Sequence, residues 1–156
     1  ATQVFLDTYA THGVSRDLAK EASTVYSISE FEHRIRKPGV EITIATCGEH
    51  MVGFLDLDST TQCPIPTVNG LEVLRLYVQG SFQRGGIGAA LMSIAERKAR
   101  EQGVPDVWLT AWSGNARALS FYTALGYRDV GITQYIIAGK AYENRVFARR
   151  SAASEA

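Results

Sequence analysis

The sequence predicts a mixed α/β (α+β) domain whose central sheet combines antiparallel strands with one parallel pair. The first 37 residues are mainly helical in pattern, and beyond residue 40 short β-branched runs alternate with amphipathic ones. A strand over 71–78, a helix and a strand over 106–112 make a strand–helix–strand unit, and its right-handed crossover implies that the two strands are parallel. At 156 residues the chain is long enough to bury one substantial core, which favours one domain.

The N-terminal region is expected to hold three short helices. In the first, Val4, Phe5 and Tyr9 lie close to helical spacing. Ser15 is expected to be the N-cap of the second, with Asp17 in its first turn. The three helices are predicted over 2–11, 15–24 and 28–37.

The third helix carries two further signals. Ser29, followed by Glu32 three residues on, fits a capping box at its N-terminus. Pro38-Gly39 ends the helix. An apolar stripe on this helix is expected to face the core, and it consists of Ile28, Phe31 and Ile35.

The rest of the chain alternates between strands and helices. Residues 40–46 favour β-branched side chains and form a hairpin with 51–58. Asn115 is expected to cap or begin the last helix, which stops at Gly126. The last residues, 151–156, are expected to form a frayed tail. The strands are predicted over 40–46, 51–58, 71–78, 106–112, 127–138 and 141–149, and the helices over 86–102 and 115–125.

Three glycines lie where the strand over 71–78 turns into the following helix, in the run Gln83-Arg84-Gly85-Gly86-Ile87-Gly88. Glycine tolerates positive φ, so the backbone can turn sharply and approach a ligand closely. The first N–H groups of a helix lack intrahelical partners and favour a bound phosphate, and Arg84 could add a charged contact. A P-loop needs Lys-Ser/Thr after the glycines and a Rossmann turn needs GxGxxG; the run has neither. A glycine turn without a ligand is the alternative.

The composition excludes several functional classes. The formal net charge is zero, which argues against nucleic acid or an anionic membrane as a partner. No apolar run approaches the roughly 20 residues that a transmembrane helix needs. The two cysteines, Cys47 and Cys63, are expected to be free thiols in a cytoplasmic protein. No metal site is expected, because the three histidines are scattered.

Two motifs together resemble those of the GCN5-related N-acetyltransferases, the GNAT superfamily. Gln83, Gly86 and Gly88 fill the pattern Q/R-x-x-G-x-G/A, which in that superfamily binds pyrophosphate. The run 115–122 fills Asn-x-x-Ala-x-x-x-Tyr, and Gly126-Tyr127 follows it. The resemblance covers about residues 40–149. It implies a twisted, mostly antiparallel sheet with helices on both faces, in a single acetyltransferase domain over 1–156.

The resemblance implies acetyl-CoA as cosubstrate. Within the domain, residues 71–126 are the expected acetyl-CoA-binding core, and helices 2–37 the acceptor side. The backbone of Leu76 and Val78 is expected to pair with the pantetheine arm as an extra strand would, and the amides of 84–89 to hold the pyrophosphate. The expected cofactor-binding residues are Leu76, Tyr77, Val78, Gln83, Arg84, Gly85, Gly86, Ile87, Gly88, Ala89, Asn115, Ala118 and Tyr122.

Asn115 and Tyr122 are seven residues apart, so both project from one face of their helix, and the small Ala118 leaves room near that face. A core aromatic is the alternative role of Tyr122. The implied reaction is direct transfer of acetyl to a primary amine, which must be neutral to attack. Glu72 is the candidate general base, directly or through water, and Tyr122 the candidate acid for the leaving thiolate. A solvated strand glutamate is the alternative for Glu72.

The acceptor is expected to be a small amine, such as a polyamine or another metabolite. A peptide or protein amine is the second possibility, and a non-catalytic acyl-CoA sensor the third. A homodimer is a family-based expectation, and the usual first strand of the family is either missing here or supplied otherwise. Acidic and aromatic residues that suit an alkylammonium are Tyr9, Tyr26, Glu30, Glu32, Tyr135 and Glu143.

Overall fold

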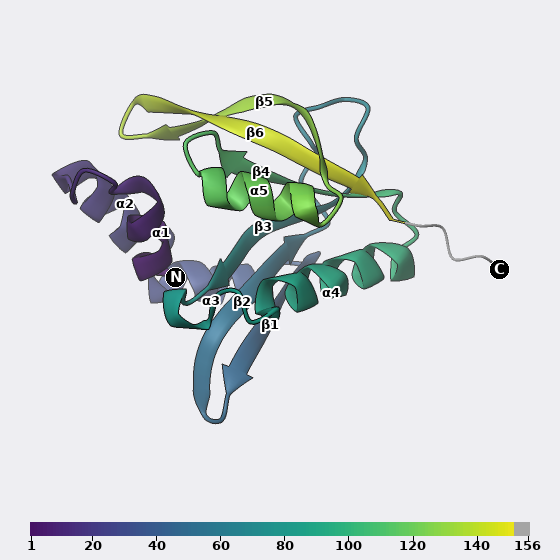
Figure 1. Cartoon of the computed structure of the whole chain (residues 1–156), viewed down its shortest axis with the longest axis horizontal. Coiled ribbons are helices and arrows are strands. Elements are labelled where there is room, and N and C mark those ends of the chain that lie inside the picture. Colours follow the sequence, from purple (N-terminus) through teal and green to yellow (C-terminus); the bar gives the residue numbers. More distant parts are fainter. Residues whose placement is uncertain (152–156) are drawn as a thin grey trace.

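The computed structural model describes residues 1–151 and consists of one six-stranded sheet with helices on both faces (Figure 1). The strand order is β1-β2-β3-β4-β6-β5, and only β3 and β4 are parallel. The predicted fold class is therefore confirmed, while the predicted tail lies outside the described residues from position 152 on. The elements are α1 Thr2–Tyr9, α2 Arg16–Val25, α3 Ile28–Arg36, β1 Val40–Cys47, β2 His50–Asp58, β3 Gly70–Val78, η1 Gly80–Phe82, α4 Ile87–Glu101, β4 Asp106–Trp112, α5 Ala116–Ala124, β5 Arg128–Ile137 and β6 Lys140–Arg150.

The two faces of the sheet are covered by different parts of the chain (Figure 1). Helices α4 and α5 pack on one face, over the main core, which includes Leu55, Leu71, Leu91 and Leu109. The other face is covered by α3, by the loop over 59–69, and by α1 and α2, which pack on the β5–β6 hairpin. We call this second face the acceptor face.

Helix α3 differs from the sequence prediction in both its cap and its buried side. The N-cap is Ser27, whose side chain accepts a hydrogen bond from the Glu30 amide, so the cap lies two residues before the predicted Ser29. The predicted apolar stripe is wrong at Ile28 and Ile35, whose side chains are exposed. The buried residue of this helix is Arg34, which pairs with acidic side chains of β2.

The parallel pair of strands separates part of the way along its length. Pairing runs from Gly70 opposite Asp106 to Val73 opposite Leu109, and then ends. Glycine is required at position 70, because a Cβ there would lie 1.8 Å from the Asp106 carbonyl oxygen. Beyond Val73 the edge of β3 that faces β4 is without a strand partner over 74–78, within the described residues.

No helix within residues 1–151 is both long and apolar enough to cross a membrane.

Candidate functional site

The glycine turn has the backbone geometry of an anion-binding helix start. Gly86 is the N-cap of α4 and adopts φ 82°, in the left-handed region. Arg84 also has positive φ, at 66°, which is uncommon for a residue with a side chain. A Cβ on Gly86 would contact nothing within 4 Å, so it is the backbone conformation that favours glycine there. The free N–H groups of the first turn of α4 therefore follow a sharply turned loop.

Gly88 brings the two motifs of the sequence together. A Cβ at this position would lie 3.0 Å from Cζ of Phe121 on α5. The first turn of α4 thus packs directly against the helix that carries Asn115 and Tyr122. The two motifs, although about 30 residues apart in the chain, form one local structure.

Gln83 links the end of β3 to α5. Its Nε2 donates to the Val78 carbonyl oxygen at 2.9 Å, and its Oε1 accepts from Arg117 Nη1 at 2.6 Å. Sequence reasoning missed Arg117, although it lies within the second motif. Its guanidinium is an exposed cation beside the glycine turn.

On α5, Asn115 is the N-cap, as predicted, and its Oδ1 accepts from the Ala118 amide at 3.1 Å. Tyr122 is buried among the rings of Phe121, Tyr127 and Phe147. Burial raises the pKa of Tyr122 well above its ordinary value, and no side chain of residues 1–151 hydrogen-bonds to its hydroxyl. The arrangement is compatible with both predicted roles, core aromatic and hydrogen-bond donor to a ligand.

Glu72 lies on the opposite side of β3, on the acceptor face. Its carboxyl is buried, and that burial raises its pKa; a hydrogen bond from Thr61 in the 59–69 loop opposes the rise. Asp58, directly opposite Glu72 on β2, raises the pKa further. The alternative of a solvated strand glutamate is therefore wrong, because the carboxyl of Glu72 is buried.

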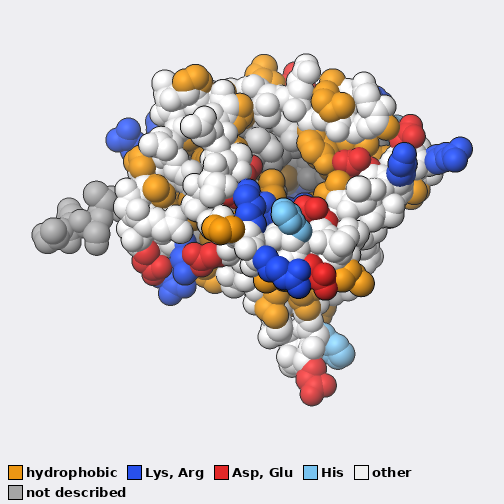
Figure 2. Space-filling model, turned by 180° about the vertical axis from the view of Figure 1, so that it is seen from behind, with side chains coloured by type: hydrophobic (Ala, Val, Ile, Leu, Met, Phe, Trp, Pro, Cys, Tyr) orange, Lys and Arg blue, Asp and Glu red, His pale blue; other side chains and the backbone are white. Residues whose placement is uncertain are grey.

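The acceptor face is hollowed near its middle (Figure 2). Thr110 of the central strand β4 is exposed on this face, although its neighbours along the strand are covered. Side chains alternate along a strand, so Trp108, Thr110 and Trp112 all point to the acceptor face. Thr110 is therefore an exposed position of the central strand on this face, and it directly follows the last residue of β4 that pairs with β3.

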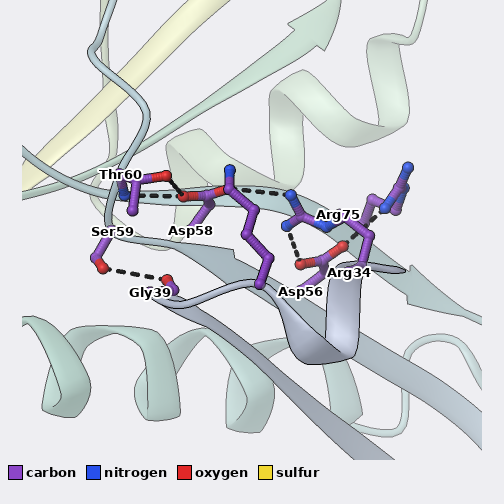
Figure 3. A network of polar contacts seen from close by, with 8 residues as sticks. Arg34, Gly39, Asp56, Asp58, Ser59, Thr60 and Arg75 are labelled. Carbon is purple, nitrogen blue, oxygen red and sulfur yellow. Dashed lines mark hydrogen bonds and ion pairs between the residues drawn. The ribbon is translucent and has the colours of Figure 1, made fainter. Parts of the chain in front are cut away.

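A buried ion network ties α3 to the strands beneath it (Figure 3). Arg34 bonds both Asp56 and Asp58, at 2.9 Å to Asp58. Arg75 pairs with Asp56 and Lys37 with Asp58, each at 2.8 Å. Sequence reasoning missed this network. Its signal was the run Leu55-Asp56-Leu57-Asp58, because acids at every second position of a buried strand need cations on the same face.

A chain of aromatic rings joins the separated ends of β3 and β4. The Tyr77 and Tyr26 hydroxyls are hydrogen-bonded, and Phe5 packs between Tyr26 and Tyr9. Tyr9 in turn packs on Trp112, with ring centroids 5.4 Å apart. The side chain of Tyr77 therefore points to the acceptor face, so only its backbone is available to the side where α4 and α5 lie.

The residues expected to bind an acceptor separate into two groups. Tyr9, Tyr26 and Tyr135 belong to the aromatic cluster, and the Tyr135 hydroxyl donates to Glu21 at 3.0 Å. Burial raises the pKa of Tyr9 to about 12, so its hydroxyl stays protonated at neutral pH. Glu32 and Glu143 are exposed and Glu30 is half-buried, and none of the three has a side-chain hydrogen bond or ion pair within residues 1–151.

Comparison with known proteins identifies the family. The model of the acetyltransferase (GNAT) family matches residues 8–127. An uncharacterized N-acetyltransferase in the pepI 3′ region of Lactobacillus delbrueckii subsp. lactis is 31% identical over 125 residues, which is 80% of this chain and 72% of that protein. The protein therefore belongs to the GNAT family.

Solved structures share the fold at low sequence identity. The PaiA N-acetyltransferase from Thermoplasma acidophilum, in complex with coenzyme A, superposes with a TM-score of 0.71 at 19% identity, over 96% of this chain and 87% of that one. The ribosomal-protein-S18-alanine N-acetyltransferase from Escherichia coli gives a TM-score of 0.64 at 19% identity, over 83% and 79% of the two chains.

Proposed function

We propose that the protein is an acetyl-CoA-dependent N-acetyltransferase that moves an acetyl group to the primary amine of a small molecule. The observation that carries this proposal is the separation of β3 from β4 next to the glycine turn. It leaves the backbone of 74–78 free on one edge, at the end of a strand that leads to the N-terminus of α4. An extended ligand with a phosphate group fits such a surface, and coenzyme A, with which the PaiA N-acetyltransferase is in complex, has an extended arm and a pyrophosphate.

The cosubstrate is held by backbone and side-chain groups along the separated strands. Leu76 and Val78 pair through their backbones with the pantetheine arm, and the amides of 84–89 hold the pyrophosphate. Asn115 already uses Oδ1 to cap α5, so its amide nitrogen is the group left to donate to a pantetheine carbonyl. The bound thioester supplies an activated acetyl group. Residues 71–126 form this part of the domain, and helices 2–37 its acceptor side.

The carboxylate of Glu72 accepts the proton that leaves the amine. The amine nitrogen forms a bond to the acetyl carbon while the carbon–sulfur bond breaks. Leu76 lies four residues further along β3, and the extra residue between Val73 and Arg75 leaves about three strand steps of roughly 3.3 Å, or ~10 Å, so water carries the proton between them. The raised pKa of Glu72 brings the carboxylate closer to the working pH of a base.

Tyr122 donates a hydrogen bond to the sulfur as negative charge develops there. Its raised pKa lies far above that of a thiol, about 8.5, so complete transfer of the phenolic proton to the thiolate is unfavourable. The hydroxyl therefore stabilises the thiolate, which takes its proton from water. A backbone N–H near Val78 donates to the acetyl oxygen during the attack.

The test is calorimetric titration with acetyl-CoA, followed by thiol release against polyamines, amino acids and lysine peptides. Gly86→Ala is the informative variant and Gly103→Ala its control, because both glycines have positive φ, at 82° and 67°, and neither Cβ would contact other atoms. Both variants carry a similar backbone strain at the two ends of α4. We expect Gly86→Ala alone to weaken acetyl-CoA binding, by about tenfold. Absence of binding to the unmodified protein, or equal losses in both variants, would refute the proposal.

The same panel separates the remaining candidates. Thiol release with peptides but not with free amines would make the protein a peptide N-acetyltransferase, the type named for the ribosomal-protein-S18-alanine relative. Binding of acetyl-CoA without turnover on any acceptor would favour a non-catalytic sensor. The small-amine proposal rests on the aromatic rings of the acceptor face and on the buried carboxyl of Glu72.

A further inference from the structure

Asn144 lies on the acceptor face at the level where chemistry is proposed. It is paired with Trp112 of β4 in the sheet register. The pairing of β3 with β2 leaves one extra residue on β3 between Val73 and Arg75, so extending the parallel register from Val73 opposite Leu109 puts Tyr77 level with Trp112. Asn144 is therefore level with the free segment of β3, whereas Glu72 is level with Trp108, four residues before Trp112 on β4. Its side chain shares the face of Val146, at alternate positions on β6.

The side-chain oxygen of Asn144 has no hydrogen-bond partner within the described residues, although the residue is only 5% exposed. The amide nitrogen lies 3.5 Å from Thr110 Oγ1, and the Asn144 side chain lowers the pKa of Tyr9, as an N–H that donates to the Tyr9 hydroxyl would. Buried polar atoms are nearly always paired, so an unmatched acceptor beside the exposed Thr110 points to a donor that is supplied by a ligand.

The surroundings of this oxygen restrict the kind of donor. The rings of Tyr9, Trp112 and Tyr142 form a triad with centroids 5.4, 5.7 and 6.3 Å apart. Ring faces attract cations and pack against apolar groups. The two guanidinium groups buried on this face, Arg34 and Arg75, are both engaged by Asp56. The lining thus favours an ammonium or amine N–H on an apolar or aromatic stem.

We propose that Asn144 Oδ1 accepts a hydrogen bond from the nitrogen of the acceptor amine, and that the site selects primary amines carried on an aromatic or aliphatic stem. This inference rests on the proposed N-acetyltransferase function and names the substrate class for it. Asn144 orients the nitrogen toward the free edge of β3, and Glu72 takes the proton through water.

The test compares Asn144→Leu with Asn144→Asp, using 2-phenylethylamine as the probe. Leucine has a similar volume but no acceptor, whereas aspartate keeps the acceptor and adds negative charge. Calorimetry in the presence of coenzyme A gives the Kd for the probe, and thiol release gives KM and kcat. We expect Asn144→Leu to raise the Kd and KM for the amine by about 10- to 100-fold. Asn144→Asp should bind the probe at least as tightly as the unmodified protein.

Thermal unfolding supplies a readout that separates binding from structure. Removing an unpaired buried polar atom should leave Tm unchanged or higher in Asn144→Leu, while amine binding is lost. The control is Gln134→Leu, an exposed amide on β5 that points away from the acceptor face, and it should change none of these values.

Several outcomes would overturn the inference. These are an unchanged amine Kd in Asn144→Leu, an equal loss in both Asn144 variants with a lowered Tm, and no binding of 2-phenylethylamine to the unmodified protein. Turnover on amines that is unaffected by Asn144→Leu would remove the inference and leave the proposed function intact. If the probe binds in a way that depends on Asn144 but the protein does not bind acetyl-CoA, the proposed function would be removed and the Asn144 site would remain.

Discussion

Arg34 is expected to be the most important single side chain for the stability of the acceptor face. It bonds Asp56 and Asp58, whose side chains are 0% and 1% exposed. Burial raises the pKa of Asp58, but hydrogen bonds from Lys37, Thr60 and Arg34 outweigh it and hold the pKa well below its usual range. Arg34→Met keeps most of the side-chain volume and removes the charge that these two carboxylates share.

The expected cost follows from the partners that remain. Breaking a buried ion pair by removing one partner costs about 3–5 kcal/mol. Arg75 still bonds Asp56 and Lys37 still bonds Asp58, both at 2.8 Å, so the lower value of about 3 kcal/mol applies. For a chain of this length, about 2–4 °C of Tm is lost per kcal/mol, which predicts a decrease of roughly 6–12 °C.

The assay is thermal unfolding followed by circular dichroism, with Arg97→Met as the matched control. Arg97 pairs with Glu101 at 3.8 Å, and both side chains are more than half exposed, so this pair should contribute less than about 1 kcal/mol. A Tm decrease for Arg34→Met no larger than that for Arg97→Met would refute the reasoning.

The pH dependence provides a second check. A carboxyl with a lowered folded-state pKa stabilises the fold above its unfolded pKa, near 4, and loses that contribution as pH falls toward the folded value. The difference in stability between Arg34→Met and the unmodified protein should therefore be complete at neutral pH and shrink below about pH 4. A difference that grows on acidification would contradict this account of the network.

Three further predictions test the helix cap and the proposed chemistry. Ser27→Ala should lower the unfolding free energy by about 1 kcal/mol, because the Ser27 side chain caps the Glu30 amide. Ser29→Ala should cost little. Equal losses in the two variants would contradict the assignment of the cap to Ser27 alone. Glu72→Gln should remove the acidic limb of the pH–rate profile and lower kcat by about 10²-fold or more. It should not lower Tm at neutral pH, because burial penalises the charged form of the Glu72 carboxyl. An unchanged pH–rate profile would exclude Glu72 as the base. Tyr122→Phe should leave Tm nearly unchanged, because its hydroxyl has no protein partner within residues 1–151, and should lower kcat; a normal kcat would leave Tyr122 with a packing role only.

Most features set by nearby residues were predictable from the sequence, although the α3 cap, at Ser27 and not Ser29, was not. The glycine turn, the Asn115 cap and the limits of most strands and helices depend on groups within a few positions of one another. The run 83–88 and the run 115–122 each form a local structure for the same reason, which is why the family could be recognised from them.

Features that depend on distant partners required the tertiary structure. Helix α3 buries Arg34 and exposes Ile28 because Asp56 and Asp58, more than 20 residues away, need a cation on that face. Its amphipathic pattern alone favoured burial of Ile28 and Ile35. The separation of β3 from β4 and the unpaired oxygen of Asn144 likewise result from pairings between segments remote in the chain. Backbone conformation is a local property of the sequence, whereas burial of a charge or an amide is decided by whichever groups the fold brings opposite it.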